Sequence, residues 1–167
     1  MLVKMKLKAQ KPEDKLLEKK TRPQLSLIGR AIRFLSYREH SIEELKRKLA
    51  PHAESEEQIN QVIQQLLDKN LLSNERFVES LILRKSNQYG VKRLSQELAM
   101  HHIDAETKAD FLKPLQSSEL ERAQALWERK FGVIATEQKE IARQMRYLMS
   151  RGFNGELVFR IIKGKHA

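Results

Sequence analysis

The sequence predicts an all-α protein of three tandem three-helix units that form an elongated, curved array. Three observations in this chain of 167 residues support that fold class. From Leu25 onward, apolar residues recur at spacings of three and four, which is typical of amphipathic helices. No segment alternates with period two over more than a few residues, and the 6 Gly and 4 Pro leave little material for hairpin turns. The apolar pattern also returns after about 49 residues, which indicates a repeat.

The first expected unit covers residues 25–73. The apolar stripe of its first helix consists of Leu27, Ile28, Ala31, Ile32 and Leu35. A second helix should begin after Ser41, because a serine hydroxyl suits an N-cap and Glu44 lies three residues later as a capping-box partner. The buried face of this helix consists of Ile42, Leu45 and Leu49. It should stop at Pro51, and a third helix follows with an apolar side of Ile59, Val62, Ile63, Leu66 and Leu67.

The second expected unit, residues 74–118, follows the same plan. Ser73 or Asn74 should cap its first helix, whose apolar residues are Phe77, Val78, Leu81 and Ile82. The chain then turns at Tyr89-Gly90. A shift of 49 residues superimposes two pairs of leucines, with Leu45 and Leu49 falling on Leu94 and Leu98. The last helix of this unit runs from about Ala105, carries Phe111 and Leu112, and should stop at Pro114.

The third expected unit covers residues 119–167. Its first apolar set consists of Leu120, Ala123, Leu126 and Trp127, and its second, after a break at Phe131-Gly132, consists of Ile141, Met145 and Leu148. After Gly152-Phe153, the last helix repeats the spacing found 99 residues earlier, so that Val158, Ile161 and Ile162 match Ile59, Val62 and Ile63. Units of about 48 residues are near the lower limit for a self-sufficient core, so neighbouring units should bury surface against one another.

A basic N-terminal arm, residues 1–24, precedes the repeats. It holds 8 Lys plus Arg against 3 acids, which is about half of the formal net charge of +10, and we expect a solvated arm. The absence of Cys excludes disulfides, thiolate chemistry and Cys-ligated metals, and a reducing, cytoplasmic setting is expected. No apolar run approaches the ~20 residues of a membrane span, and Lys interrupts the opening residues too often for a signal peptide.

Catalytic and metal sites have little support in the sequence. His101-His102-Ile103-Asp104 is the only cluster that could suggest a metal site. Adjacent histidines of a helix point about 100° apart, and although a loop could bring them together, a polar helix end is the preferred interpretation. Glu75 and Glu79 share a helix face without the apolar surroundings that acid–base catalysis requires. The glycines are isolated, so no phosphate-binding loop or nucleophile elbow is present. We therefore expect no enzyme activity, no metal and no cofactor.

Cations without nearby acids are the better candidates for a functional surface. The excess of basic residues favours acidic partners such as nucleic acid or an acidic protein surface. The aromatic residues Trp127, Phe131 and Tyr147 could stack on bases. Trp127, however, is expected in the core, because it lies beside Leu126 in an apolar set with helical spacing. The residues predicted to contact a partner are Arg30, Arg33, Tyr37, Arg38, Arg84, Lys85, Lys92, Arg93, Arg129, Lys130, Arg143, Arg146 and Arg151.

Four motifs in order resemble those of the RecX regulatory proteins, which act on the bacterial recombinase RecA. The first is the segment Ala31 to Leu45, and the second is Ser73-Asn74-Glu75-Arg76-Phe77, where Asp is more usual than Asn74 in the family. The third is Tyr89-Gly90-Val91-Lys92-Arg93-Leu94 with Glu97-Leu98. The fourth is Arg151-Gly152-Phe153 followed by Ile161-Ile162. The resemblance covers about residues 25–163 and leaves out the N-terminal arm.

The resemblance implies a regulator without a catalytic site. Such a protein would lodge in the groove or at the end of the RecA filament on DNA, and would hinder filament extension, ATP hydrolysis and strand exchange in DNA recombination, DNA repair and the SOS response. It would contact RecA chiefly and single- or double-stranded DNA weakly, as a monomer with no membrane partner. A basic helical rod agrees with this expectation, because a nucleoprotein filament offers phosphates and acidic protein surface side by side.

A stand-alone DNA-binding protein is the alternative hypothesis. In that case the helix capped by Ser41, which carries Lys46, Arg47 and Lys48, would enter a DNA groove in the manner of a helix-turn-helix protein. Glu43 and Glu44 lie at the N-terminal end of this helix, where a recognition helix meets bases and phosphates. These two acids count against the alternative.

Overall fold

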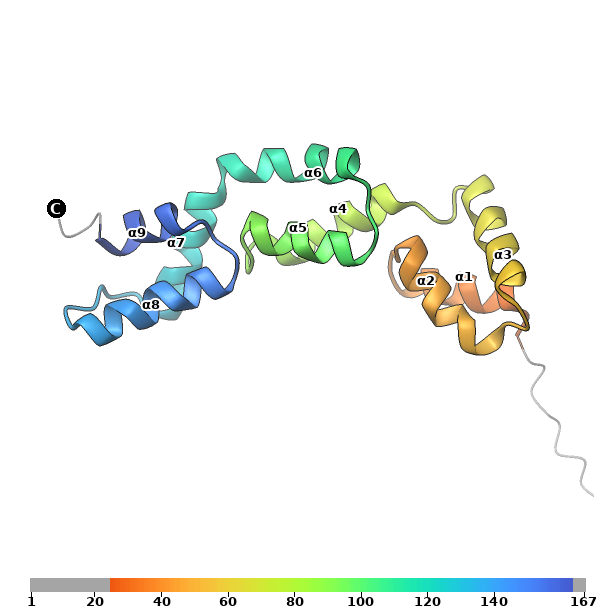
Figure 1. Ribbon diagram of the computed structural model, residues 1–167, viewed down its shortest axis with the longest axis horizontal. Coiled ribbons are helices and arrows are strands. Elements are labelled where there is room, and N and C mark those ends of the chain that lie inside the picture. Colours follow the sequence, from red (N-terminus) through yellow and green to blue (C-terminus); the bar gives the residue numbers. More distant parts are fainter. Residues whose placement is uncertain (1–24, 164–167) are drawn as a thin grey trace, which may run out of the picture.

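The computed structural model describes residues 25–163, and every regular element in this range is a helix (Figure 1). The N-terminal arm, residues 1–24, and residues 164–167 lie outside it. The helices are α1 Leu27–Tyr37, α2 Ile42–Leu49, α3 Glu56–Asp68, α4 Asn74–Lys85, α5 Val91–Met100, α6 Ala105–Ser117, α7 Glu119–Lys130, α8 Gln138–Ser150 and α9 Gly155–Lys163, with a short 3₁₀ helix at Ala50–His52.

The helices form an elongated arch rather than a compact globule (Figure 1). The group α1–α3 lies at one end, α4–α6 lies in the middle, and α7–α9 lies at the other end. Each group encloses its own cluster of buried apolar side chains. The all-α array of three-helix groups predicted from the sequence is therefore confirmed.

The predicted apolar faces form these three cores. Leu45 and Leu49 are fully buried in the first group, as are Leu94 and Leu98 in the second. Trp127 is buried in the third group, as expected, and its indole Nε1–H donates to Gln144 Oε1 at 2.9 Å. This bond satisfies the polar end of the ring, so the indole fills the core without an unpaired donor.

Two helix starts show how serine caps set the helix boundaries. The Ser41 hydroxyl accepts from Glu44 N–H at 3.0 Å, and the Ser73 hydroxyl accepts from Arg76 N–H at 3.2 Å. Ser73 rather than Asn74 is therefore the cap of α4. The expected capping box at Glu44 is wrong, because the carboxylate of Glu44 binds the Arg38 guanidinium instead.

The expected stop at Pro114 is also wrong, since α6 continues to Ser117. A proline inside a helix removes one N–H donor, which here leaves the carbonyl of Asp110 without its usual partner. Pro114 and Asp110 are both exposed, so water can bind that carbonyl and the helix continues. Pro51 behaves as predicted, because α2 ends at Leu49 and only a short 3₁₀ helix contains the proline.

Candidate functional site

The second and third groups meet backbone to backbone at two glycines. Gly90 N–H donates to the Arg151 carbonyl at 2.9 Å, and Gly152 follows with φ +83°, a left-handed conformation that favours glycine. A Cβ on Gly90 would overlap the Gly152 carbonyl, and a Cβ on Gly152 would lie 2.6 Å from Arg93 N. Glycine at both positions therefore lets the start of α5 and the end of α8 come into direct contact.

Two side chains of α7, which no sequence pattern singled out, stabilise the same contact. Glu119 is buried, and its Oε1 accepts from Val91 N–H at 2.9 Å at the start of α5, where Gly90 offers no side-chain cap. The Arg122 guanidinium donates to the carbonyls of Ser86 and Tyr89, at 2.5 and 3.0 Å. Burial lowers the pKa of Arg122, and Glu119 opposes this effect. The loop between α4 and α5 is thus held by charge-assisted hydrogen bonds.

Cations and aromatic rings alternate across the same junction. We call Lys85, Tyr89, Arg93, Tyr147 and Arg151 the junction cluster. The guanidinium of Arg93 lies 4.7 Å from the centre of the Tyr89 ring, and that of Arg151 lies 5.8 Å from Tyr89 and 4.6 Å from Tyr147. Lys85 Nζ lies 5.9 Å from the Tyr89 ring and 2.5 Å from the Glu97 carboxylate. Such cation–π contacts favour these positions of the charged groups.

A small cavity of about 170 Å³ opens beside the junction cluster. It is lined by Gln88 and Leu126 and by Arg129, Lys130, Tyr147 and Arg151. No ion pair found within residues 25–163 uses Arg129, Lys130 or Arg151. Three cations without a carboxylate partner, next to an aromatic ring, can bind a phosphate or a carboxylate group of a partner.

Five of the predicted contact residues come together in this region. Lys85, Arg93 and Arg151 belong to the junction cluster, and Arg129 and Lys130 line the adjoining cavity. Tyr147, which was considered for stacking, lies among them, with the Phe131 ring 5.2 Å from its own in an edge-on arrangement. Residues separated by up to 66 positions thus form one basic and aromatic surface.

The other predicted contact residues lie elsewhere. Arg38 is bound to both carboxylate oxygens of Glu44, and Arg143 pairs with Glu140 at 3.0 Å, so internal partners already hold these two. Arg84 donates to the Ser80 carbonyl of its own helix at 3.0 Å. The remaining five are Arg30, Arg33 and Tyr37 on α1, Lys92 on α5 and Arg146 on α8.

The first and second groups meet through side chains. The Ser41 hydroxyl lies 2.9 Å from His101 Nδ1, and because it already accepts from Glu44 N–H, we assign its own hydrogen to His101. Asn74 Oδ1 accepts from Ile42 N–H at 3.1 Å, and Arg76 pairs with Glu39 at 2.9 Å. His101 therefore acts as a neutral acceptor at this junction.

His40, in the first group, is a second neutral histidine. Its Nδ1–H donates to the Arg38 carbonyl at 2.9 Å, while its Nε2 accepts from Lys48 Nζ at 3.0 Å. Burial lowers the pKa of His40, and the Arg38 carbonyl raises it in part. Burial also lowers the pKa of His101, which Glu44 and Glu97 raise in part. Burial raises the pKa of Glu44, but the hydrogen bonds from Arg38 and the positive charges nearby, among them Arg38 and Lys48, together outweigh it and lower that pKa overall.

The lowered pKa values of His40, His101 and Glu44 predict that acid destabilises the protein. Because both histidines have folded-state pKa values below the unfolded value of about 6.5, the unfolded chain binds more protons and stability falls as the pH drops below 6.5. Glu44 adds a further loss as the pH falls through its lowered pKa. Urea unfolding at pH values from about 7.5 to 5 should show the part of this decline that the two histidines cause, and His101→Asn, which keeps an acceptor, should reduce it. Equal pH dependence in the wild type and the variant would contradict the assignment of His101.

The His101-His102 pair ends α5, as predicted. His101 is the C-cap, and His102 has φ +53° and lies 3.7 Å from the Glu43 carboxylate. No group of three or more potential metal-ligating residues occurs within the described range 25–163. None of the helices described there is long and apolar enough to cross a membrane.

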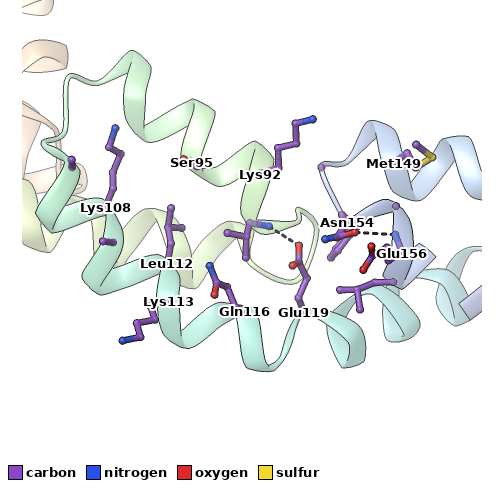
Figure 2. A pocket seen from close by; sticks show the side chains of 17 residues that line it. Lys92, Ser95, Lys108, Leu112, Lys113, Gln116, Glu119, Met149, Asn154 and Glu156 are labelled. Atoms are coloured by element: carbon purple, nitrogen blue, oxygen red, sulfur yellow. Dashed lines mark hydrogen bonds between the residues drawn. The ribbon is translucent and has the colours of Figure 1, made fainter. Parts of the chain in front are cut away.

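A larger groove lies on another part of the same junction, between α5 and α6 on one side and the turn from α8 to α9 on the other. Its volume is about 1210 Å³. Figure 2 shows Lys92 and Lys108 on the α5–α6 side, and Met149 and Glu156 on the side of the third group. Leu112 and Phe153 are among its apolar lining residues.

Known proteins are similar to this chain in sequence and in fold. Two family models match it, one described as RecX, first three-helix domain, over residues 28–66, and one described as RecX, third three-helix domain, over residues 117–162. The regulatory protein RecX of Ralstonia pickettii is 48% identical over 143 residues, which are 86% of this chain and 90% of that protein. The regulatory protein RecX of Ralstonia nicotianae is 45% identical over 146 residues, with coverage of 87% and 92%.

A solved structure shows the same helical arrangement. The crystal structure of RecX from Lactobacillus salivarius matches with a TM-score of 0.65 and 22% identity, over 83% of this chain and 93% of that one. The sequence relatives are named as regulatory proteins, which points to a regulatory rather than a catalytic role. The agreement of the family models, the close relatives and the helical array shows that this chain belongs to the RecX family of regulatory proteins.

Proposed function

We propose that this protein binds the RecA filament on DNA, in its groove or at its end, and inhibits filament extension, ATP hydrolysis and strand exchange. The observation that carries the proposal is the junction cluster with its adjoining cavity, where Arg129, Lys130 and Arg151 have no carboxylate partner in the described chain. A filament on DNA presents phosphates and acidic side chains that such a surface can bind. The arched shape of the array suits a curved groove (Figure 1).

The predicted contact residues contribute unequally to the proposed binding surface. Lys85, Arg93, Arg129, Lys130 and Arg151 form the main binding surface. Arg30, Arg33, Tyr37, Arg84, Lys92 and Arg146 extend it along the array. Arg38 and Arg143 contribute less, because Glu44 and Glu140 already neutralise them. The protein acts as a monomer in the cytoplasm, contacts DNA weakly, has no catalytic role, and has unit boundaries after Ser73 and after Ser118.

RecA ATPase measurements test this function. We expect wild-type protein to lower DNA-dependent ATP hydrolysis by RecA at well below one molecule per RecA, because a blocked end or groove affects many subunits. The double variant Arg129→Glu/Lys130→Glu should lose most of this inhibition, because both side chains are exposed and reversing them makes the surface repel phosphates.

The matched control is Lys69→Glu/Lys139→Glu, which changes the net charge equally on exposed residues outside the junction. It should inhibit RecA like the wild type. Unchanged ATP hydrolysis at saturating wild-type protein would contradict the proposed function. Equal loss of inhibition in both double variants would show that only the overall charge matters and that the junction is not the binding surface.

The alternative, a stand-alone helix-turn-helix DNA-binding protein, is disfavoured by the surroundings of α2. Its N-terminus is covered by the second group, since Ser41 contacts His101, Ile42 N–H donates to Asn74, and Glu43 lies near His102. A recognition helix needs this end free to reach the bases. We therefore expect tighter binding to the RecA filament than to the same naked DNA.

A further inference from the structure

We propose that the large groove between α5, α6 and the start of α9 binds an acidic peptide segment of a partner protein that also carries apolar side chains. Its volume, about 1210 Å³, exceeds the roughly 300 to 1,000 Å³ of typical small-molecule pockets. The groove is therefore large enough for a stretch of polypeptide. It is separate from the junction cluster, since the two share no lining residue.

The charged residues that line the groove favour an occupant with negative charge. Lys92, Lys108 and Lys113 line it, and no ion pair in the described part of the chain involves them. Of its two acidic residues, Glu119 is buried and bound to Val91 N–H, which leaves Glu156 as the exposed one (Figure 2). The accessible charges are thus mainly positive, and an acidic segment complements them.

The apolar residues that line the groove favour a peptide rather than a nucleic acid as its ligand. Met149 is 52% exposed at the edge of the groove, and Leu112 and Leu157 lie along it. None of the described residues that line it is Arg, Tyr or Trp, and Phe153 is only 3% exposed, so the groove offers little ring surface for bases to stack on. Arg and Tyr side chains lie at the junction cluster instead. A segment with carboxylates for the lysines and an apolar side chain for the methionine fits this surface best.

The groove also leaves room for a peptide backbone. A Cβ added to Gly155, at the first position of α9, would meet no atom within 4 Å. Ala105 and Ala109 present similarly short side chains from α6. An extended segment can therefore lie close to the main chain there, and the glycine contact between Gly90 and Gly152 keeps the two walls at a fixed separation.

Peptide binding to the full chain tests this proposal. The probe is a fluorescein-labelled peptide of repeated Asp-Glu-Leu, and fluorescence anisotropy measures its binding. Repeated Asp-Glu-Ser should bind more weakly, because it lacks the apolar side chain. Lys92→Glu/Lys108→Glu should weaken binding of the Asp-Glu-Leu peptide by about tenfold, since two attractive contacts become repulsive. Gly155→Trp, whose Cβ would meet no atom within 4 Å, places an indole in the groove and should weaken binding as well.

Methionine methyl resonances locate the bound peptide. The chain has 5 Met, of which Met149 lines the groove and Met100, 73% exposed, lies outside it. Addition of the Asp-Glu-Leu peptide should shift the methyl resonance of Met149 and leave that of Met100 in place. Lys69→Glu/Lys139→Glu should bind the peptide within about twofold of the wild type, because screening weakens charges outside the groove.

Three kinds of result would overturn the proposal. The first is the absence of specific binding, seen either as no binding of the Asp-Glu-Leu peptide or as equal weakening in both double lysine variants. The second is a shift of Met149 by oligothymidylate but not by the acidic peptide, which would assign the groove to nucleic acid. The third is a shift of Met149 only by a synthetic peptide of residues 1–24, which would make the N-terminal arm the occupant. None of these measurements uses RecA, so their outcome is independent of the ATPase experiment.

Discussion

Replacing Leu94 by Ala is expected to lower the free energy of unfolding by about 2 to 5 kcal/mol. Leu94 is 0% exposed and lies in the core of the middle group, where its neighbours include Leu81 and Leu98. Removing its side chain costs the transfer free energy of the buried atoms and leaves a cavity. Because this core is small, few other contacts can compensate. Urea unfolding followed by far-ultraviolet circular dichroism measures the loss.

Leu83→Ala is the matched control for this variant. Leu83 belongs to the same group, on α4, but it is 79% exposed. Its replacement should change the free energy of unfolding by no more than about 0.5 kcal/mol. A comparable loss in both variants would mean that the two faces of the middle group are not arranged as the structure shows.

Replacing Gly90 by Ala is expected to destabilise the protein by about 1 to 3 kcal/mol, although it adds a single methyl group. The added Cβ would overlap the carbonyl of Gly152, so the backbone of one group must move. This movement would weaken the hydrogen bond from Gly90 N–H to Arg151 and displace Arg151 from Tyr89. Thermal unfolding measures the loss of stability, and RecA inhibition should fall with it because the junction cluster is distorted.

Gly155→Ala provides the comparison. The same methyl group there meets no atom within 4 Å, and the residue opens α9, so we expect a neutral or slightly stabilising change of about 0.4 to 1 kcal/mol. A neutral Gly90→Ala would show that the second and third groups are not packed backbone to backbone.

The helices and cores could be predicted because they depend on local spacing. Apolar residues three and four apart define a buried face wherever the chain is helical, and this rule found Leu45, Leu94 and Leu148. The same local rules failed at Pro114, because its tolerance depends on exposure to solvent rather than on residue type. Glu44 was wrongly expected in a capping box, because the spacing within the helix does not reveal its actual partner, Arg38, which precedes the helix.

The candidate site was only partly predictable. Arg93 and Arg151 could be singled out as cations without nearby acids, but the chain separates them by 58 residues and only the contact of α5 with the end of α8 brings both to Tyr89. No sequence pattern singled out Glu119 or Arg122 of α7. Their role depends on the loop from Ser86 to Val91, whose free backbone groups no sequence pattern reveals.

The two junctions of the array differ in how firmly they hold their neighbours. The second and third groups share a main-chain hydrogen bond at Gly90, and a single residue, Ser118, separates α6 from α7. Between the first and second groups, within the described residues, the bonds run through side chains such as Ser41, His101 and Arg76. We therefore expect thermal bending of the arch to be concentrated between the first and second groups. In the proposed complex with a filament, the stiff part of the array would stay bound while the first group adjusts to changes in the pitch of the helical groove.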